Sequence, residues 1–430
     1  MAGSIKHTVK QWLKKGMYDF VKVCPPARKL VRNMLFRYRG WVYRRAVRGV
    51  VTDPNLMVFC VFSGRGYSDS PRALYEYMVN REEYQNYRYV WVFQQPQRFR
   101  WLEEQFPNTS VVAWAGSAYQ KAMAAAKYWI FNYRVSDHIW PRADQVYLEC
   151  WHGTPLKRLG YDLETNGNVM NSNSEIRQKY DLDAAKFRYI LSPSAFATEK
   201  FTSAWNLKAI GKESAVIQEG YPRNDFLLNH TEADVERVKK SLQITPEAIG
   251  GRKVILYAPT WRDNQHDSST GYSYQLGVDF DRLRQALGED VIILFRAHYL
   301  VASQFDFAAY AGFVYDVSGW PDINELYIVA DLLITDYSSV FFDYANLKKP
   351  ILFYMYDLAA YRDDIRGFYL SLEELPGPIV ETEAELIAAI PEDLARPAYD
   401  EKYQRFHQRF NHLDDGNASE RVVKRLLEES

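Results

Sequence analysis

The chain has 430 residues, of which 47% are hydrophobic and 25% are charged. These proportions are typical of a folded globular protein and exclude a disordered chain, and the length exceeds the usual size of one hydrophobic core. Cys24, Cys60 and Cys150 are too scattered for a metal site or a disulfide framework, which indicates a reducing compartment. We therefore expect two domains without structural disulfides.

The net charge of −1 conceals a strong asymmetry along the chain. Residues 1–50 hold thirteen Lys or Arg residues against one acidic residue, Asp19, which is a net charge of +12. The other 380 residues carry 40 basic and 53 acidic residues, a net charge of −13. A basic N-terminal arm therefore precedes an acidic body.

Apolar residues recur in this arm at helical spacing, in one set before Pro25-Pro26 and in another after it. The pattern predicts two cationic amphipathic helices, with Trp12 and Trp41 on their apolar faces. No apolar run is long enough for a spanning helix or a signal peptide. We expect residues 1–50 to lie on an anionic inner membrane leaflet, the alternatives being a nucleic-acid-binding arm or helices packed on the body.

From residue 56 onward, short apolar strands alternate with helical stretches, which is the pattern of βαβ units. The pattern predicts an α/β fold of two doubly wound, Rossmann-like lobes with a cleft between them, at residues 51–210 and 211–398. Residues 399–430 are expected to form a helix, over 400–429, that braces the lobes. The predicted strands are 56–62, 89–93, 110–113, 128–131, 145–150, 189–191, 254–258, 291–295, 313–315, 332–335 and 351–354.

In the first lobe, a predicted strand runs directly into His152 and Gly153, and Thr154-Pro155 opens a helix. A histidine at a strand end can act as a general base, because its pKa lies near working pH. The alternative is a histidine that only bridges a turn. Lys157 and Arg158 follow closely and add positive charge for an anionic substrate, which favours the catalytic interpretation.

In the second lobe, the strand at 332–335 ends in a polar turn that carries Ser338 and Ser339 just before a helical pattern. Free N–H groups at a helix start bind phosphate, although the serines alone are also consistent with an ordinary N-cap. Two further predicted strands end at the same sheet edge and place Arg262, Arg296 and His298 there. In such sheets, ligands bind beyond the carboxyl ends of the parallel strands. These groups together predict a pyrophosphate site.

Other candidate residues carry weaker signals. Arg223 lies in a turn at the predicted crossing between the lobes, and Arg366 offers another guanidinium. Asp336 and Asp343 are expected to hold the serine turn by hydrogen bonds, because a carboxylate beside a diphosphate would repel it. There is no Walker loop, no GxGxxG motif and no metal-ligating pair of histidines, so we expect neither a metal nor a cofactor.

Several of these segments resemble the CDP-glycerol glycerophosphotransferase family, the primases and polymerases of teichoic acid synthesis. The resemblance extends over about residues 55–400 in the family's order. Because the extra N-terminal domain of some bifunctional members does not appear in this sequence, the resemblance does not decide between primase and polymerase. The matching segments are Trp-His-Gly-Thr-Pro-Leu-Lys at 151–157, Tyr-Ala-Pro-Thr-Trp-Arg at 257–262, Arg-Ala-His at 296–298, Asp-Ile-Asn-Glu-Leu-Tyr at 322–327, Thr-Asp-Tyr-Ser-Ser-Val-Phe-Phe-Asp at 335–343 and Pro-Gly-Pro-Ile-Val at 376–380.

The resemblance implies a GT-B fold and transfer of glycerol phosphate, or a related polyol phosphate, from CDP-glycerol to a hydroxyl of a lipid-linked, undecaprenyl-type acceptor, with release of CMP. It implies that His152 is the catalytic histidine of the first lobe and that the donor-phosphate groups are Arg296, His298, Ser338 and Ser339. We expect His298 to take part in catalysis as well, with Gly153 and Thr154 in support. We accordingly expect a peripheral protein on the cytoplasmic face of the cell membrane that binds no nucleic acid. Competing interpretations are a GT-B glycosyltransferase that uses a sugar nucleotide and a non-catalytic, membrane-bound polymer-binding protein.

Overall fold

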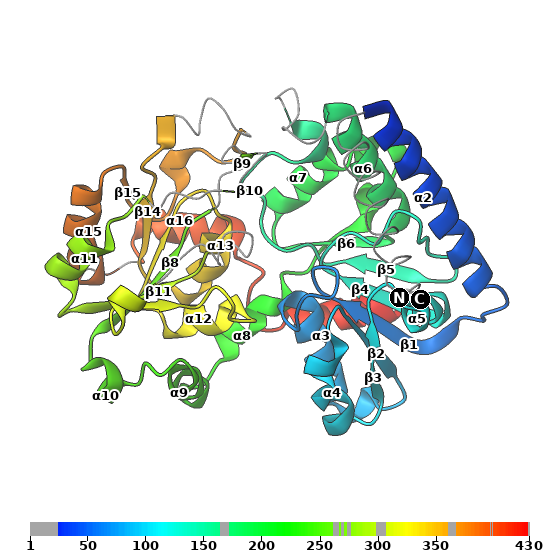
Figure 1. Ribbon diagram of the computed structural model, residues 1–430, viewed down its shortest axis with the longest axis horizontal. Coiled ribbons are helices and arrows are strands. Elements are labelled where there is room, and N and C mark those ends of the chain that lie inside the picture. Colours follow the sequence, from blue (N-terminus) through cyan, green and yellow to red (C-terminus); the bar gives the residue numbers. More distant parts are fainter. Residues whose placement is uncertain are drawn as a thin grey trace, which may run out of the picture.

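The computed structural model describes residues 25–163, 172–260, 266–267, 271–272, 277–297, 307–359, 367–395, 397 and 399–428. Two parallel β-sheets, each covered by helices on both faces, form two lobes side by side (Figure 1). The prediction of an α/β fold with two lobes is therefore confirmed.

The first lobe is built on a seven-stranded sheet in the order β3-β2-β1-β4-β5-β6-β7, and all its neighbouring strands are parallel. Consecutive side chains such as Val58 and Phe59 are both fully buried on opposite faces, which explains the continuous apolar runs in the sequence. The strands are β1 (Asp53–Cys60), β2 (Arg88–Phe93), β3 (Thr109–Ala113), β4 (Ala126–Phe131), β5 (Val146–Glu149), β6 (Tyr189–Ser192) and β7 (Val216–Gln218).

Two details of the predicted strands are wrong in this lobe. The first strand ends at Cys60 and not at residue 62, because Phe62 and Ser63 adopt left-handed backbone angles, with φ of 44° and 58°. The short strand β7 was not predicted from the sequence. Its three residues are too few for a periodic pattern.

Helices cover both faces of the first sheet. Leu74 of α3 packs with Val422 of α17 on one face, while Met123 of α5 and Phe201 of α7 pack on the other. The helices of this lobe are α2 (Pro25–Ala46), α3 (Asp69–Val79), α4 (Trp101–Gln105), α5 (Ser117–Ala125), α6 (Asn173–Lys186), α7 (Ala195–Ala204) and α17 (Ala418–Glu428).

The second lobe has a parallel sheet in the order β12-β11-β8-β13-β14-β15. Phe341 of α13 and Phe406 of α16 pack on one face, and Leu283 of α11 and Leu386 of α15 pack on the other. The strands are β8 (Lys253–Ala258), β11 (Val291–Phe295), β12 (Val314–Asp316), β13 (Leu332–Thr335), β14 (Ile351–Tyr354) and β15 (Ile379–Val380), beside the hairpin β9 (His266–Asp267) and β10 (Gly271–Tyr272). The helices are α8 (Asp225–Asn229), α9 (Glu232–Ser241), α10 (Pro246–Ile249), α11 (Phe280–Leu287), α12 (Ile323–Val329), α13 (Val340–Tyr344), α15 (Glu383–Ala395) and α16 (Glu401–Phe410).

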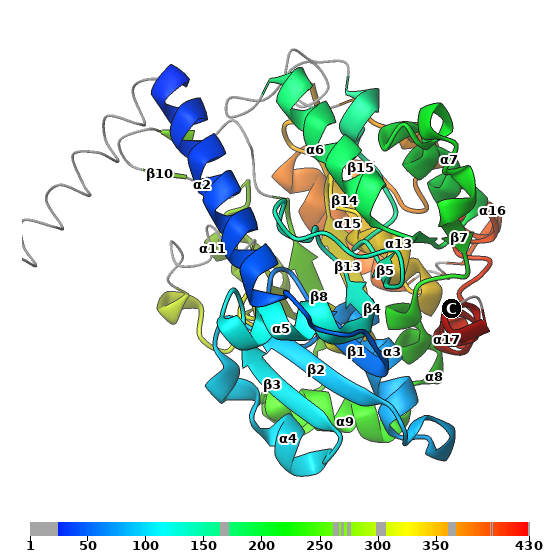
Figure 2. The same ribbon diagram turned by 90° about the vertical axis from the view of Figure 1, so that its right-hand side faces the viewer.

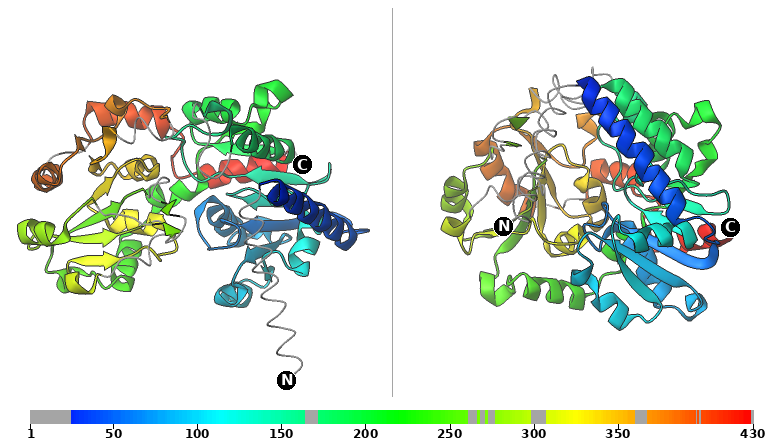
Figure 3. Two further views of the ribbon diagram at one scale, coloured as in Figure 1. Left: turned by 45° about the horizontal axis from the view of Figure 1, so that its top comes forward. Right: turned by 45° about the vertical axis from the view of Figure 1, so that its right-hand side comes forward.

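The C-terminal segment crosses from the second lobe to the first. The prediction of one helix over 400–429 is wrong, because α16 ends at Phe410 and α17 begins at Ala418. Gly416 lies in the break with a φ of 85°, where an added Cβ would contact the Asn229 side chain. The break lets α16 join the core of the second lobe while α17 completes the core of the first (Figure 3).

The described part of the basic arm is helix α2, which begins at the predicted Pro25-Pro26 break and lies along the outside of the first lobe (Figure 2). Tyr43 is buried among the side chains of that lobe. Trp41 is 52% exposed and Tyr38 62% exposed. The predicted helix ahead of Pro25 lies outside the described residues, and no helix within them is both long and apolar enough to span a membrane.

We predict that Val422→Ala destabilises the first lobe, although residue 422 is almost at the end of the chain. Val422 is fully buried, so losing two methyl groups should lower the free energy of unfolding by roughly 1.5–3 kcal/mol. Denaturant unfolding measures the loss, and hydrogen exchange should place it in β1 and β2. Lys424→Ala, at an exposed position of the same helix, is the control and should change stability little.

Candidate active site

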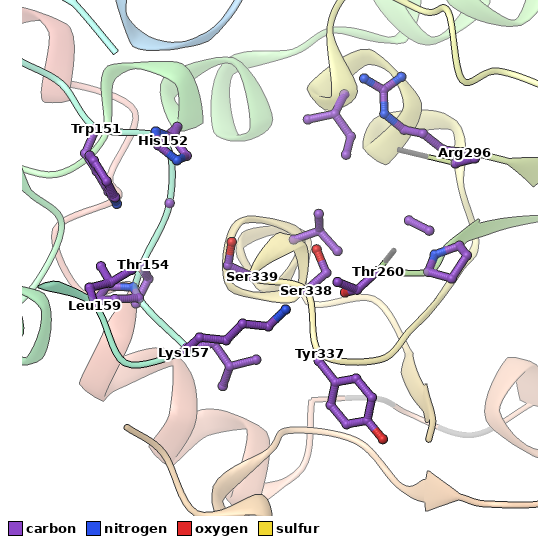
Figure 4. A pocket seen from close by; sticks show the side chains of 18 residues that line it. Trp151, His152, Thr154, Lys157, Leu159, Thr260, Arg296, Tyr337, Ser338 and Ser339 are labelled. Atoms are coloured by element: carbon purple, nitrogen blue, oxygen red, sulfur yellow. The ribbon is translucent and has the colours of Figure 1, made fainter. Parts of the chain in front are cut away.

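A cavity of about 420 Å³ lies between the lobes, at the carboxyl ends of the strands of both sheets (Figure 4). The first lobe contributes residues of the loop after β5, and the second contributes residues that follow β8, β11 and β13. His152, Gly153, Thr154, Ser338, Ser339 and Arg296, all predicted site residues, line this one cavity.

His152 is held in place by a tight turn after β5. Trp151 has a left-handed φ of 53°, and its backbone N–H donates to the Glu149 carboxyl at 3.0 Å. Tyr147 also donates to that carboxyl, which is fully enclosed, and burial raises the pKa of Glu149 to about 8. The strained backbone of Trp151 is therefore fixed by a buried acceptor, and this turn directs His152 into the cavity.

The protonation state of His152 follows from its surroundings. Its Nδ1 lies 3.0 Å from the backbone carbonyl oxygen of Asn132, and a carbonyl only accepts, so Nδ1 carries the proton. Burial, reinforced by the positive charge of Arg223, lowers the pKa of His152. The imidazole is therefore neutral near pH 7, and Nε2 is left as an unprotonated base.

The serine turn lies opposite, after β13. The Asp336 carboxylate accepts from the backbone N–H of Thr260 at 2.8 Å and from that of Tyr337, so it holds this turn against the loop after β8. The Ser339 side chain does not cap α13, and both serine hydroxyls face the cavity (Figure 4). Since α13 has only five residues, we attribute any anion binding here to the hydroxyls and the turn more than to a helix dipole.

Arg296 lines the cavity, but its guanidinium is engaged in the second lobe. Its Nη1 donates to the backbone carbonyls of Val317 at 3.1 Å and Trp320 at 2.9 Å. The side chain thus anchors the loop after β12. Arg296 still lines the cavity, and its contact with a donor phosphate stays a prediction.

Lys157 is a cavity residue that we expected only to add positive charge near the site. Its side chain extends from the first lobe toward Ser338 (Figure 4). The surrounding loop pairs with the second lobe, because Arg158 N–H donates to Gly367 O and Tyr369 N–H donates to Leu156 O, both at 2.9 Å. A cation from one lobe is therefore held close to the hydroxyls of the other.

The remaining predicted residues divide into two groups. Arg223 and Asp343 form a buried ion pair, with an Nη2 to Oδ2 distance of 2.8 Å, and neither residue lines the cavity. Arg262, His298 and Arg366 lie outside the described residues, so their roles stay predictions. Among the residues that are described, no three His, Cys, Asp or Glu side chains are grouped as metal ligands.

Residues 42–428 match the family described as CDP-Glycerol:Poly(glycerophosphate) glycerophosphotransferase. A teichoic acid poly(glycerol phosphate) polymerase of Bacillus subtilis is 38% identical over 430 residues, which cover 99% of this chain and 55% of the relative. A teichoic acid glycerol-phosphate transferase of Staphylococcus aureus is 37% identical, and the match covers 87% of this chain and 93% of that protein. The chain thus spans about half the length of the first relative and nearly all of the second.

The same relationship holds in three dimensions. The structure of the wall teichoic acid polymerase TagF superimposes with a TM-score of 0.79 at 33% identity, covering 93% of this chain and 95% of that one. A variant of that polymerase, soaked with CDPG for 15 minutes, superimposes with the same score. The two-lobed arrangement is therefore the GT-B fold.

We predict that Gly153→Ala weakens turnover without unfolding the chain. A Cβ at residue 153 would lie 2.9 Å from the Ser339 hydroxyl oxygen, so the serine or the lobe must move. Displacing a site group by a fraction of an ångström to an ångström should lower kcat/KM roughly 10- to 100-fold. Gly66→Ala is the control, because its new Cβ meets only the Ser68 hydroxyl at 3.9 Å. Equal kinetics of the two variants would contradict the close contact.

Proposed function

Because the chain belongs to the CDP-glycerol glycerophosphotransferase family, we propose that it transfers glycerol phosphate, or a related polyol phosphate, from CDP-glycerol to a hydroxyl of a lipid-linked acceptor. CMP is released, and the product belongs to teichoic acid or a similar cell-surface polymer. The observation that carries this proposal is a neutral His152 that faces Ser338 and Ser339 across a single cavity.

The acceptor oxygen attacks the phosphorus that bears glycerol. A new P–O bond forms there, the pyrophosphate P–O bond breaks, and CMP leaves with the bonding electrons. His152 Nε2 takes the proton of the acceptor hydroxyl. Such phosphoryl chemistry depends mainly on positioning and charge stabilisation, which suits a site that is built from two facing lobes.

The donor pyrophosphate would lie against the second lobe, where the hydroxyls of Ser338 and Ser339 donate to its oxygens. Lys157 reaches the same space from the first lobe and would neutralise charge that develops on the departing CMP. His298, Arg262 and Arg366 are proposed on the family resemblance to complete this cationic site. Arg296, which lines the cavity, would contribute its charge to the donor phosphates and would also fix the loop after β12.

The lipid-linked acceptor would meet the enzyme at a membrane surface. Helix α2 exposes Met34, Leu35, Phe36, Tyr38 and Trp41. Arg44 and Arg45 lie in its last turn. Exposed apolar and basic side chains on one helix suit the interface of an anionic membrane, which would hold the enzyme peripherally on the cytoplasmic face beside its lipid-linked acceptor.

We predict that His152→Ala abolishes transfer while CDP-glycerol still binds. Loss of a general base lowers the rate by about 10² to 10⁴, whereas the donor would be held mainly by the second lobe. CMP release from CDP-glycerol with a lipid-linked acceptor measures turnover, and calorimetry measures donor binding. A rate within threefold of wild type would remove His152 from the mechanism, and turnover of a sugar nucleotide in place of CDP-glycerol would overturn the proposed donor.

We also predict that Leu35→Asp combined with Trp41→Asp weakens binding to anionic vesicles at high salt. Apolar insertion persists when salt screens the charges, so removing two exposed apolar side chains should release most of the protein. Sedimentation with vesicles at low and high salt measures the effect. Tyr43 must stay, because it is buried in the first lobe and a deletion of residues 1–50 would damage the core. Unchanged binding of the double variant would place membrane contact elsewhere.

A further inference from the structure

The carbonyl that orients His152 belongs to Asn132, which follows β4. The Asn132 side chain is itself fully buried and bonded at both ends. Its Oδ1 accepts from the backbone N–H of Phe62 at 2.9 Å, and its Nδ2 donates to Asp69 Oδ2 at 2.9 Å. The support of the imidazole therefore depends on a carboxylate that sequence analysis did not identify.

Asp69 lies at the first position of α3, with a left-handed φ of 63°. Its side chain is 6% exposed, and the oxygen that accepts from Asn132 also accepts from Arg223 Nη1 at 3.2 Å. A non-glycine residue in this conformation is strained, and Asp and Asn tolerate it best. The strain and the shared oxygen indicate that the position of this carboxylate matters.

Arg223 continues the connection into the second lobe. Its Nη2 donates to Asp343 Oδ2 at 2.8 Å, and its backbone carbonyl accepts from Asn324 at 2.6 Å. Asp343 belongs to α13, the helix that begins directly after Ser339. Hydrogen bonds thus run without interruption from the imidazole of His152 to the helix that follows the serine turn.

We infer that Asp69 is a positioning residue, which through Asn132 fixes the imidazole of His152 and through Arg223 and Asp343 aligns it with the serine turn of the opposite lobe. This inference rests on the proposed role of His152 as the base. It assigns Asp69 no contact with substrate.

The negative charge of Asp69 also affects the pKa of His152. The charged groups that face the imidazole from the elements around it are Asp69, whose negative charge raises its pKa, and Arg223, whose positive charge lowers it. Lys157 lines the same cavity. Removing the charge of Asp69 therefore lowers the pKa of His152 further, and the acid limb of the rate profile should move to lower pH.

The test is Asp69→Asn in the full chain. Asn keeps the size of the side chain and tolerates the backbone conformation, but it removes the carboxylate that Asn132 and Arg223 share. We expect kcat to fall about 10- to 100-fold, because a small misplacement of a catalytic group has effects of that size. The KM for CDP-glycerol should stay within about twofold of wild type, and the acid limb should move to lower pH.

Arg72→Gln provides a matched control on the same helix. Arg72 makes a further ion pair between α3 and the second lobe, with a distance of 3.1 Å to Asp322, and its hydrogen bonds among the described residues go to Glu76 and Asp322 and not to Asn132. If Asp69 acts only by holding the lobes together, both variants should lower kcat alike. That result, or a kcat for Asp69→Asn within threefold of wild type, overturns the inference.

A second variant keeps the test decisive if Asp69→Asn folds poorly. Asn132→Ser removes the donor to Asp69 and leaves the backbone carbonyl of residue 132 in place, so it should also lower kcat with little change in KM. The kcat of the double variant should be no lower than that of the more impaired single variant, because both residues support His152 through the same hydrogen bond. Additive losses overturn the inference.

The variant His152→Ala distinguishes this inference from the proposed function. If His152→Ala stays active, the proposed base has failed. An inactive His152→Ala together with an active Asp69→Asn refutes the positioning role alone.

Discussion

Two buried carboxylates, Asp69 from one lobe and Asp343 from the other, share the guanidinium of Arg223, and the relative placement of the lobes depends on this contact. Burying three charges is expensive, since the desolvation penalty for each ion is several kcal/mol. A buried ion pair is therefore weak evidence for stability and better understood as a device that fixes one geometry. An apolar contact between the lobes would allow them to slide, whereas two directed hydrogen bonds from one planar group allow a single arrangement.

The consequence of that arrangement is visible at the point where the two halves of the cavity meet. A Cβ on Gly153 would lie 2.9 Å from the Ser339 hydroxyl oxygen and 3.7 Å from Arg223 Nη2. The neighbouring loop with Lys157 pairs with residues 367–369 of the other lobe. Base, hydroxyls and cation are thus held on opposite walls of one cavity by contacts between the two lobes.

Sequence patterns located the site residues that stand at strand ends. His152, Ser338 and Ser339 each follow an apolar run that a parallel sheet buries, and the topology then brings those ends together. Groups that depend on distant partners were not predictable. Arg296 bonds carbonyls 21 and 24 residues further along the chain, and Asp69 meets Arg223 across 154 residues, so no local spacing reveals either contact. The break between α16 and α17 does have a local signal, Asp414-Asp415-Gly416, which the prediction of a single helix overlooked.

The crossing of the C-terminal segment also determines the order in which the protein can be completed. Helix α17 supplies Val422, Val423 and Leu426 to the core of the first lobe, whose strands are synthesised some two hundred to nearly four hundred residues earlier. During translation, at about 5–20 residues per second, the first sheet must therefore wait for roughly ten seconds or more with part of one apolar face uncovered. The second lobe has a much shorter delay with α16, because only α15 separates that helix from the last strand, β15. On the ribosome, the lobe that is made first is the one that is finished last.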